Sequence, residues 1–203
     1  PTGKGVINKM KISCMKGKLM QGISNVSKAV STKTTHPILS CIFIEAENGN
    51  IKLTANDMEI GIESYVEGTV IEEGKVAIEA KLLSDIVRKL PDSEIHMETN
   101  EDFKTTIKCE KSLFTIAGKS GEDFSSLPVV EKSKFITISQ FTLREIINQT
   151  IFSISDSEYN NVMTGELFEV SNNRLRVVAI DGHRIAIRNV ELKNESEDVK
   201  VIV

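Results

Sequence analysis

Residues 12–63 read ISCMKGKLMQGISNVSKAVSTKTTHPILSCIFIEAENGNIKLTANDMEIGIE, and residues 136–187 read ITISQFTLREIINQTIFSISDSEYNNVMTGELFEVSNNRLRVVAIDGHRIAI. Laid over one another without a gap, the two stretches keep a constant offset of 124 residues. Leu19 then falls on Leu143, Ile23 falls on Ile147, and Asp57 falls on Asp181. Few residues are identical, but the apolar positions coincide. An internal repeat of this kind indicates two copies of one folding unit.

Each copy predicts a short strand followed by a helix. The strands are expected at 12–14 and 135–138, and the helices at 16–30 and 139–152. Apolar residues recur at helical spacing in both helices. In the first helix they are Leu19, Ile23, Val26 and Val30, and in the second they are Leu143, Ile146, Ile147 and Phe152.

A hairpin follows each helix. In the first copy, strands at 38–46 and 51–55 are joined by Asn48-Gly49, a strong two-residue turn signal. The second copy has Asn172-Asn173 at the same place, and asparagine tolerates a positive φ angle.

The first copy then continues into a second half. A helix is expected at 80–90, ending before Pro91. Strands are expected at 65–70, 75–78, 94–98, 104–109 and 113–117. These elements predict the α+β class, with two helices packed on antiparallel sheets in each of two tandem domains.

The domain boundaries follow from the repeat. We expect a tag remnant or upstream extension at 1–9, a first domain at 10–118 and a linker at 119–134, which is rich in Gly, Ser and Pro. Residues 135–203 then form the first half of a second domain, truncated relative to the first.

Composition narrows the class of protein. Of 203 residues 40% are hydrophobic, enough for packed cores, yet no apolar run approaches the roughly 18 residues of a membrane helix. We therefore expect no membrane contact, and the first ten residues lack the apolar core of a secretory signal. The three cysteines, Cys14, Cys41 and Cys109, favour reduced thiols in a cytoplasmic protein. His36, His96 and His183 stand at no metal-ligand spacing to them, so neither metal nor cofactor is expected.

Charge is unevenly distributed. The net charge is −4, but residues 1–44 contain seven lysines and no Asp or Glu, which leaves 18 basic and 29 acidic residues beyond them. A basic surface on an acidic body can attract phosphate locally while repelling non-specific partners. The alternative is a surface that only keeps the protein soluble.

Catalytic motifs are scarce. The chain has no phosphate-binding glycine loop, no GxSxG and no HExxH. Asp181-Gly182-His183-Arg184 is the best candidate for acid–base chemistry. The first copy has Asn56-Asp57-Met58-Glu59 there, without His or Arg, so a charged strand end is the favoured interpretation and no enzyme is expected.

Four ordered segments resemble the bacterial beta sliding clamps, the beta subunits of DNA polymerase III. They are KTTHPIL at 33–39, TANDME at 54–59, GEDFSSLP at 121–128 and AIDGHRIA at 179–186. The resemblance covers about residues 10–203 and implies tandem DNA-clamp-type domains, three per subunit in a head-to-tail homodimer when full length. Such a ring is a DNA polymerase processivity factor that encircles double-stranded DNA, with helices lining the hole. Its implied partners in DNA replication are the DNA polymerase III catalytic subunit, the clamp loader, repair polymerases and other proteins with clamp-binding motifs.

The resemblance also implies three sets of site residues. The DNA-binding set is Lys16, Lys18, Lys28, Lys33, Lys81, Arg88, Lys89, Arg144, Ser157 and Asn161. One wall of a cleft for partner peptides is Met163, Ile180, Gly182, His183, Arg184 and Ile185; Ile180 stands where relatives commonly have Thr. The dimer interface set is Lys104, Lys111 and Phe114.

Two other functions remain open at this point. One is a repeat-built scaffold that binds peptides and does not enclose DNA. The other is a hydrolase or nuclease that uses the segment from Asp181 to His183.

Overall fold

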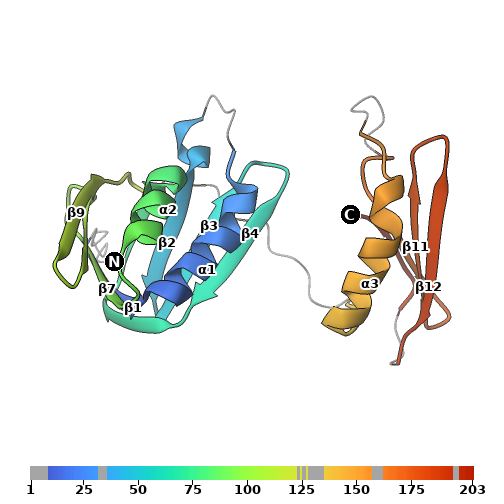
Figure 1. Ribbon diagram of the computed structural model, residues 1–203, viewed down its shortest axis with the longest axis horizontal. Coiled ribbons are helices and arrows are strands. Elements are labelled where there is room, and N and C mark those ends of the chain that lie inside the picture. Colours follow the sequence, from blue (N-terminus) through green and yellow to red (C-terminus); the bar gives the residue numbers. More distant parts are fainter. Residues whose placement is uncertain are drawn as a thin grey trace, which may run out of the picture. The chain divides into compact units, whose positions relative to one another are not determined.

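The computed structural model describes residues 9–31, 36–122, 124, 127, 135–156, 162–193 and 197–203. The chain divides into two compact units, Pro1–Pro128 and Val129–Val203. We call them unit 1 and unit 2 and describe each by itself (Figure 1).

The described residues of unit 1 form two antiparallel sheets and two α-helices. Its elements are β1 (Met10–Met15), α1 (Lys16–Val26), η1 (Ser27–Ala29), η2 (Pro37–Ser40), β2 (Cys41–Glu47), β3 (Asn50–Asn56), β4 (Gly61–Val66), β5 (Gly68–Glu72), β6 (Gly74–Glu79), α2 (Ala80–Lys89), β7 (Glu94–Thr99), β8 (Lys104–Cys109) and β9 (Ser112–Ala117). One sheet has the order β5-β1-β7-β8-β9 and the other has the order β4-β3-β2-β6.

The two helices of unit 1 lie side by side against one continuous core (Figure 1). Leu19 and Ile23 of α1 and Leu83 and Val87 of α2 are fully buried in it. Helix α2 ends at Lys89 because Leu90, the residue before Pro91, adopts an extended conformation.

Unit 2 is smaller. Its described elements are α3 (Gln140–Thr150), η3 (Ile151–Ser153), β10 (Leu167–Ser171), β11 (Arg174–Ile180), β12 (Ile185–Glu191) and β13 (Val199–Ile202), with the sheet order β12-β11-β10-β13. The Ser139 hydroxyl caps α3 by accepting a hydrogen bond of 3.0 Å from the Thr142 amide. Ile146 of α3 packs on the sheet with Leu175 and Val177.

The predicted repeat is confirmed by element bounds and by strand register. The bounds of α1 and α3, and those of β3 and β11, differ by 124 at both ends. Phe43 pairs with Thr54 in unit 1, and Leu167 pairs with Val178 in unit 2, at the same offset. The register of the last strand is shifted by one residue between the units. Phe43 of β2 pairs with Ala77 of β6, whereas its counterpart Leu167 of β10 pairs with Ile202 of β13, which lies 125 rather than 124 residues after Ala77.

Several predicted elements were wrong in detail. Residues 135–138 form no strand, whereas their counterpart β1 pairs with β5 and β7. The strand predicted from residue 38 begins at Cys41, because Pro37 opens a 3-10 turn. The first helix also ends at Val26, and η1 replaces its last turn. Among the described residues, unit 2 has one α-helix, α3.

The segment after β9 packs on unit 1. Lys119 and Ala77 exchange two backbone hydrogen bonds, of 2.8 and 3.0 Å, and the Phe124 ring stacks on Phe43 with centroids 5.0 Å apart. The predicted linker at 119–134 therefore includes residues that belong to unit 1.

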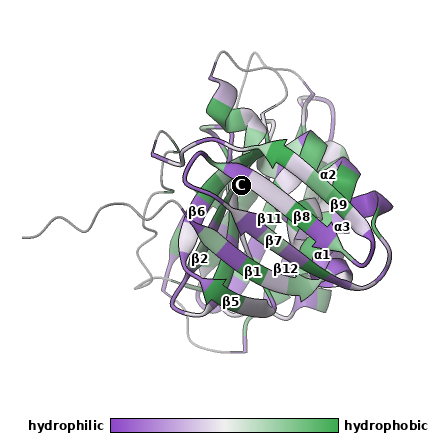
Figure 2. Ribbon diagram, turned by 90° about the vertical axis from the view of Figure 1, so that its left-hand side faces the viewer, coloured by the Kyte–Doolittle hydropathy of each residue, from purple (hydrophilic) through white to green (hydrophobic). Residues whose placement is uncertain are grey.

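Hydrophobic and hydrophilic residues alternate along several strands, as expected of sheets that bury one face (Figure 2). Among the described residues no helix has the length and apolar character needed to cross a membrane.

Candidate functional site

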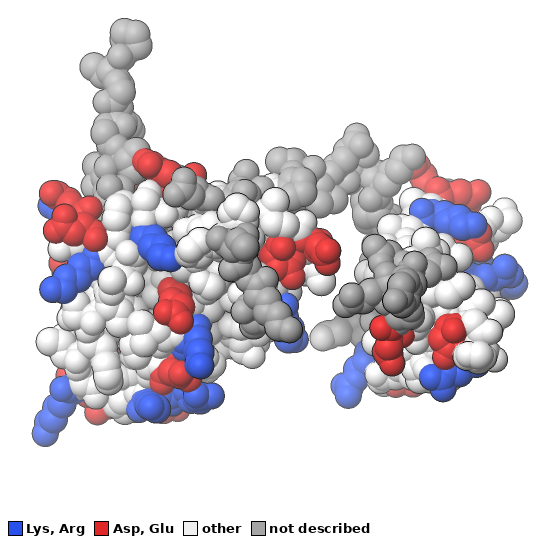
Figure 3. All heavy atoms as spheres, turned by 90° about the horizontal axis from the view of Figure 1, so that it is seen from above, with Lys and Arg blue, Asp and Glu red and all other residues white. Residues whose placement is uncertain are grey.

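The helices of unit 1 are its basic part. Residues 16–29 and 80–89 contain six basic residues and one acidic residue, whereas the rest of residues 1–128 contains ten basic and 17 acidic residues. The helices thus carry a balance of +5 and the remainder one of −7. On the face seen in Figure 3 the two signs are interspersed on each unit.

The predicted DNA-facing cations differ in how they are held. Lys16 is half-buried, and its ammonium donates a 2.5 Å hydrogen bond to the Leu90 carbonyl just after α2. Lys18 pairs with Glu67 at 2.8 Å, which raises the pKa of Lys18.

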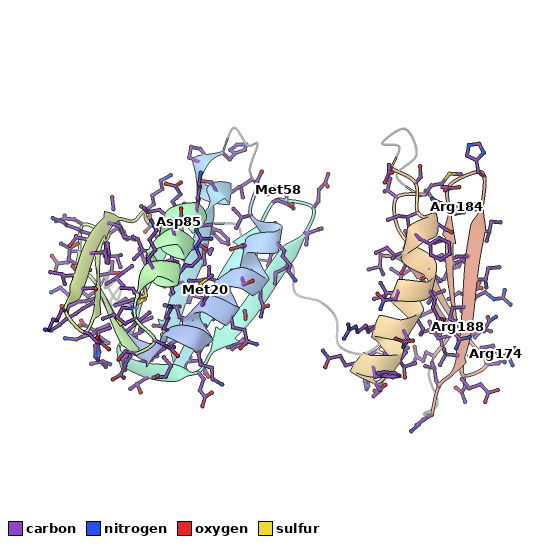
Figure 4. All side chains as sticks on the ribbon, in the orientation of Figure 1. Met20, Met58, Asp85, Arg174, Arg184 and Arg188 are labelled. Atoms are coloured by element: carbon purple, nitrogen blue, oxygen red, sulfur yellow. The ribbon has the colours of Figure 1, made fainter. Side chains whose placement is uncertain are left out.

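The remaining members of that set are exposed or outside the described residues. Arg88 pairs with Asp85 within α2, where Figure 4 labels Asp85. Figure 4 also labels Met20 of α1, which packs against the core. The exposed members are Lys28, Lys81, Lys89 and Arg144. Lys33, Ser157 and Asn161 lie outside the described residues.

The β11–β12 turn is organised by Asp181. Its Oδ1 accepts the amide hydrogens of His183 at 2.9 Å and Arg184 at 3.0 Å, and its Oδ2 accepts a hydrogen bond of 2.7 Å from Nε of Arg184. The His183 amide and the Arg184 guanidinium hold the pKa of Asp181 below its usual range. A carboxylate stabilised in this way is a poor general base at neutral pH.

The same turn recurs in unit 1. Oδ1 of Asp57 accepts the amides of Glu59 at 3.0 Å and Ile60 at 2.7 Å, and these hydrogen bonds lower the pKa of Asp57. Met58 at φ 80° occupies the position of Gly182 at φ 89°. Because the turn forms without His or Arg, the geometry favours a structural role for Asp181 over a catalytic one.

The residues of the predicted cleft wall gather at one end of unit 2. Ile180 and Ile185 are register partners across β11 and β12, and Ile185 is 59% exposed. The Arg184 guanidinium lies 5.9 Å from the centre of the Phe152 ring in η3 (Figure 4). Met163 lies beside the same end, since its carbonyl accepts a 2.8 Å hydrogen bond from the Ser155 amide.

Sequence reasoning missed an apolar row on the outer face of the same sheet, the face opposite α3. The row crosses all four strands and consists of Ile187, Val178, Leu167 and Ile202. Ile187 is 58% exposed. Strand alternation could have found it, because buried Val177 and Ala179 flank Val178 in β11.

The predicted dimer residues lie at an edge of unit 1. Phe114 is in β9, the last strand of the five-stranded sheet, and Lys111 is in the turn before it. Lys104 begins β8 and is register partner of Ala117. All three are exposed.

Cys14, Cys41 and Cys109 are free and buried, as expected of core thiols. Within the described ranges, no group of three or more His, Cys, Asp or Glu side chains could hold a metal ion. A hollow of about 660 Å³ lies on unit 2 between Arg174, Arg176 and Glu191, at the other end of the sheet from Ile180.

Two family models match the chain. Residues 10–128 match the DNA polymerase III beta subunit, N-terminal domain, and residues 137–203 match the central domain of the same subunit.

Known relatives agree with these matches. The chain is 36% identical to the beta sliding clamp of Halalkalibacterium halodurans, over 89% of this chain and 50% of that protein, and 34% identical to that of Bacillus subtilis, over 90% and 50%. A solved structure from Eubacterium rectale, described as a DNA polymerase III beta subunit, has a TM-score of 0.91 and 56% identity, covering 96% of this chain and 53% of that one. The Bacillus subtilis sliding clamp also has a TM-score of 0.91, with 31% identity, 97% of this chain and 54% of that one. The chain spans about half the length of the curated relatives it matches.

Proposed function

This chain belongs to the DNA polymerase III beta subunit family, and from that premise we propose that it works as part of a sliding clamp. The clamp is a non-catalytic processivity factor that encircles double-stranded DNA in replication and tethers the replicative polymerase. Its relatives carry the name beta sliding clamp, which supports this reading over a scaffold that never encloses DNA.

The observation that carries the proposal is the separation of charge in unit 1. The two α-helices and the 3-10 turn η1 hold six of its basic residues and one acidic residue, while the remainder is acidic. A few exposed cations attract the phosphate backbone without binding it tightly, and an acidic body limits non-specific adhesion. Weak, sequence-independent attraction is what a sliding ring requires.

Reversing the charge of exposed cations on these helices tests whether they face DNA. In the full-length protein, Lys28→Glu, Lys81→Glu and Lys89→Glu together should weaken DNA binding at low salt and flatten its salt dependence by roughly three phosphate contacts. Lys108→Glu, Lys193→Glu and Lys200→Glu are the matched control, since these exposed residues lie outside the helices. Equal losses in both triple variants would contradict the helices as the DNA-facing surface.

We further propose that Met163, Ile180, Gly182, His183, Arg184 and Ile185 form one wall of a cleft for short partner peptides. Ile180 and the exposed Ile185 offer an apolar seat, and the adjacent charged turn can fix peptide direction. One solved relative, from Pseudomonas aeruginosa, is bound to griselimycin, and one from Caulobacter crescentus has PEG at a beta-motif tethering region. The proposed peptide donors are the polymerase catalytic subunit, the clamp loader and repair polymerases.

The exposed edge around Phe114 supports a role in subunit contact. We place the head-to-tail dimer interface of the full-length clamp there, with Lys104 and Lys111 beside the edge strand β9. Three buried free thiols are compatible with a cytoplasmic location.

A further inference from the structure

The segment that follows β9 crosses the outer face of the four-stranded sheet in unit 1. We call its described residues, Lys119 to Glu122, Phe124 and Leu127, the strap. It begins on β6, where Lys119 bonds to Ala77, and reaches β2, where Phe124 stacks on Phe43. It then reaches β4, where Leu127 covers Gly61 so closely that a Cβ there would overlap it.

The strap is closely fitted to the sheet. A Cβ on Gly121 would overlap the Phe43 ring, so glycine lets the strap approach the ring. Phe124 is 8% exposed and belongs to a small cluster with Cys41, Phe43 and Ala77, separate from the main core. The strap therefore has its own apolar contacts on a face that the helices do not reach.

The equivalent face of unit 2 differs in chemistry. On the outer face of unit 1, Thr54 is 3% exposed and Asn56 is 8% exposed. Their counterparts at the offset of 124 are the half-buried Val178 and Ile180. The counterpart of Gly61 is Ile185, which is 59% exposed. Unit 1 has polar side chains and a glycine at these three positions, where unit 2 has aliphatic side chains.

We propose that the strap is an internal ligand of unit 1, which occupies its outer sheet face and so closes that face to apolar peptides. Phe124 and Leu127, an aromatic and an aliphatic residue three positions apart, are its two anchors. The fit to the strap is particular to unit 1, because Ile185 stands in unit 2 where Gly61 receives Leu127 in unit 1. The closure of unit 1 does not rest on the proposed function.

Cys41 reports on the strap directly. It is 1% exposed beneath the strap, whereas Cys14 and Cys109 are buried in the main core. Phe124→Ala with Leu127→Ala should increase the rate at which a disulfide reagent such as Ellman's labels Cys41 by about tenfold or more, because opening of the strap becomes easier. Labelling of Cys14 and Cys109, located by mass spectrometry, should not change.

A second variant leaves both anchors in place. Gly61→Ile introduces the residue type of Ile185 and displaces Leu127, so it should also accelerate labelling of Cys41. Gly17→Ala is the matched control, since a Cβ there meets nothing within 4 Å. It should leave Cys41 at the wild-type rate.

The third experiment adds the strap to the protein as a separate peptide. An excess of the synthetic peptide KSGEDFSSLP, residues 119–128, should restore protection of Cys41 in the Phe124→Ala, Leu127→Ala variant. The same peptide with alanine at both anchor positions should not. A fluorescently labelled form of the peptide should also bind this variant at one more site per chain than it binds on the wild-type chain.

The proposal is overturned if Cys41 stays protected in both strap variants, or if the peptide fails to protect it while Cys14 and Cys109 remain unreactive. Labelling of all three cysteines would mean that the anchors hold the core rather than a separable strap, which also contradicts the proposal. None of these measurements involves DNA or a polymerase, so their failure is distinct from failure of the clamp function.

Discussion

The carboxylate of Glu45 lies 2.7 Å from the Lys52 ammonium on the neighbouring strand, and the same relationship recurs 124 residues later, where Glu169 lies 3.8 Å from Arg176. In both units a lysine flanks the glutamate from the other side, Lys75 at 3.2 Å and Lys200 at 3.6 Å. The repeat thus preserves a cross-strand ion pair as well as a pattern of apolar residues.

We predict that this network makes unit 1 sensitive to acid. Burial acts to raise the pKa of Glu45, but hydrogen bonds from Lys52 and Lys75 outweigh it and the pKa falls below its ordinary 4.5. A lowered folded-state pKa contributes stability above about pH 4.5 that is lost as the pH falls through the folded value. Glu45→Gln should lower the free energy of unfolding at pH 7 by about 1 kcal/mol or less, with the difference vanishing in acid. Urea unfolding at both pH values measures this.

Glu98→Gln is the control for that prediction. Glu98 pairs with Lys11 at 3.4 Å, but its side chain is 64% exposed. Its replacement should change the free energy of unfolding little at either pH. An equal effect of both substitutions would contradict a special role for the Glu45 network.

Adjacent leucines in α2 should differ sharply in their effect on stability. Leu83 is fully buried and Leu82 is 39% exposed. Leu83→Ala removes a buried side chain and should cost about 2–5 kcal/mol, whereas Leu82→Ala should cost well under that. Denaturant titration gives both values. Similar costs would mean that the helix faces the core differently.

The equivalent turns predict opposite effects of glycine. Met58 holds a φ of 80° that disfavours L-residues, and Gly182 adopts 89° at the same repeat position. Met58→Gly should stabilise unit 1 by up to about 1 kcal/mol, and Gly182→Ala should destabilise unit 2 by about that amount. Thermal unfolding of each variant tests the pair, and a loss of stability in both would show that the Met58 side chain contributes contacts that matter more.

Lys16 should act on stability more than on DNA. Its ammonium binds the Leu90 carbonyl next to the end of α2, where a cation is favoured. Lys16→Met should cost roughly 1 kcal/mol of unfolding free energy and leave DNA affinity nearly unchanged. Lys28→Met, at an exposed lysine, should do the reverse. A Lys16 variant of normal stability and weakened DNA binding would restore Lys16 to the DNA-facing set.

Much of this fold could be predicted because each element of the repeat occurs twice in the sequence, so the prediction for one copy could be compared with that for the other. The hairpin turns at Asn48 and Asn172 and the helix positions of Leu19 and Leu143 agreed between copies, and the structure confirms their register. Elements that depend on distant partners were less predictable. Residues 135–138 have the pattern of a strand but form none, although their counterpart β1 pairs with strands on both sides.

The candidate site was predicted less completely than the fold. Sequence marked Asp181 and Arg184 as chemically suggestive, but the turn hydrogen bonds that occupy Asp181 depend on three-dimensional geometry. Phe124 looked like part of a polar linker, because its stacking partner Phe43 lies about 80 residues earlier in the sequence. Lysines on a helix look alike in sequence, so the burial of Lys16 could not be foreseen.

The central claim is that the full-length clamp holds DNA topologically, and its most direct test compares circular with linear DNA. The protein is loaded onto nicked circular duplex by its clamp loader, and the amount retained is measured before and after the circle is cut once. We predict stable retention on circles and rapid loss from the linear form, because a ring slides off a free end. Equal retention on both forms would show ordinary surface binding and would contradict the sliding-clamp account.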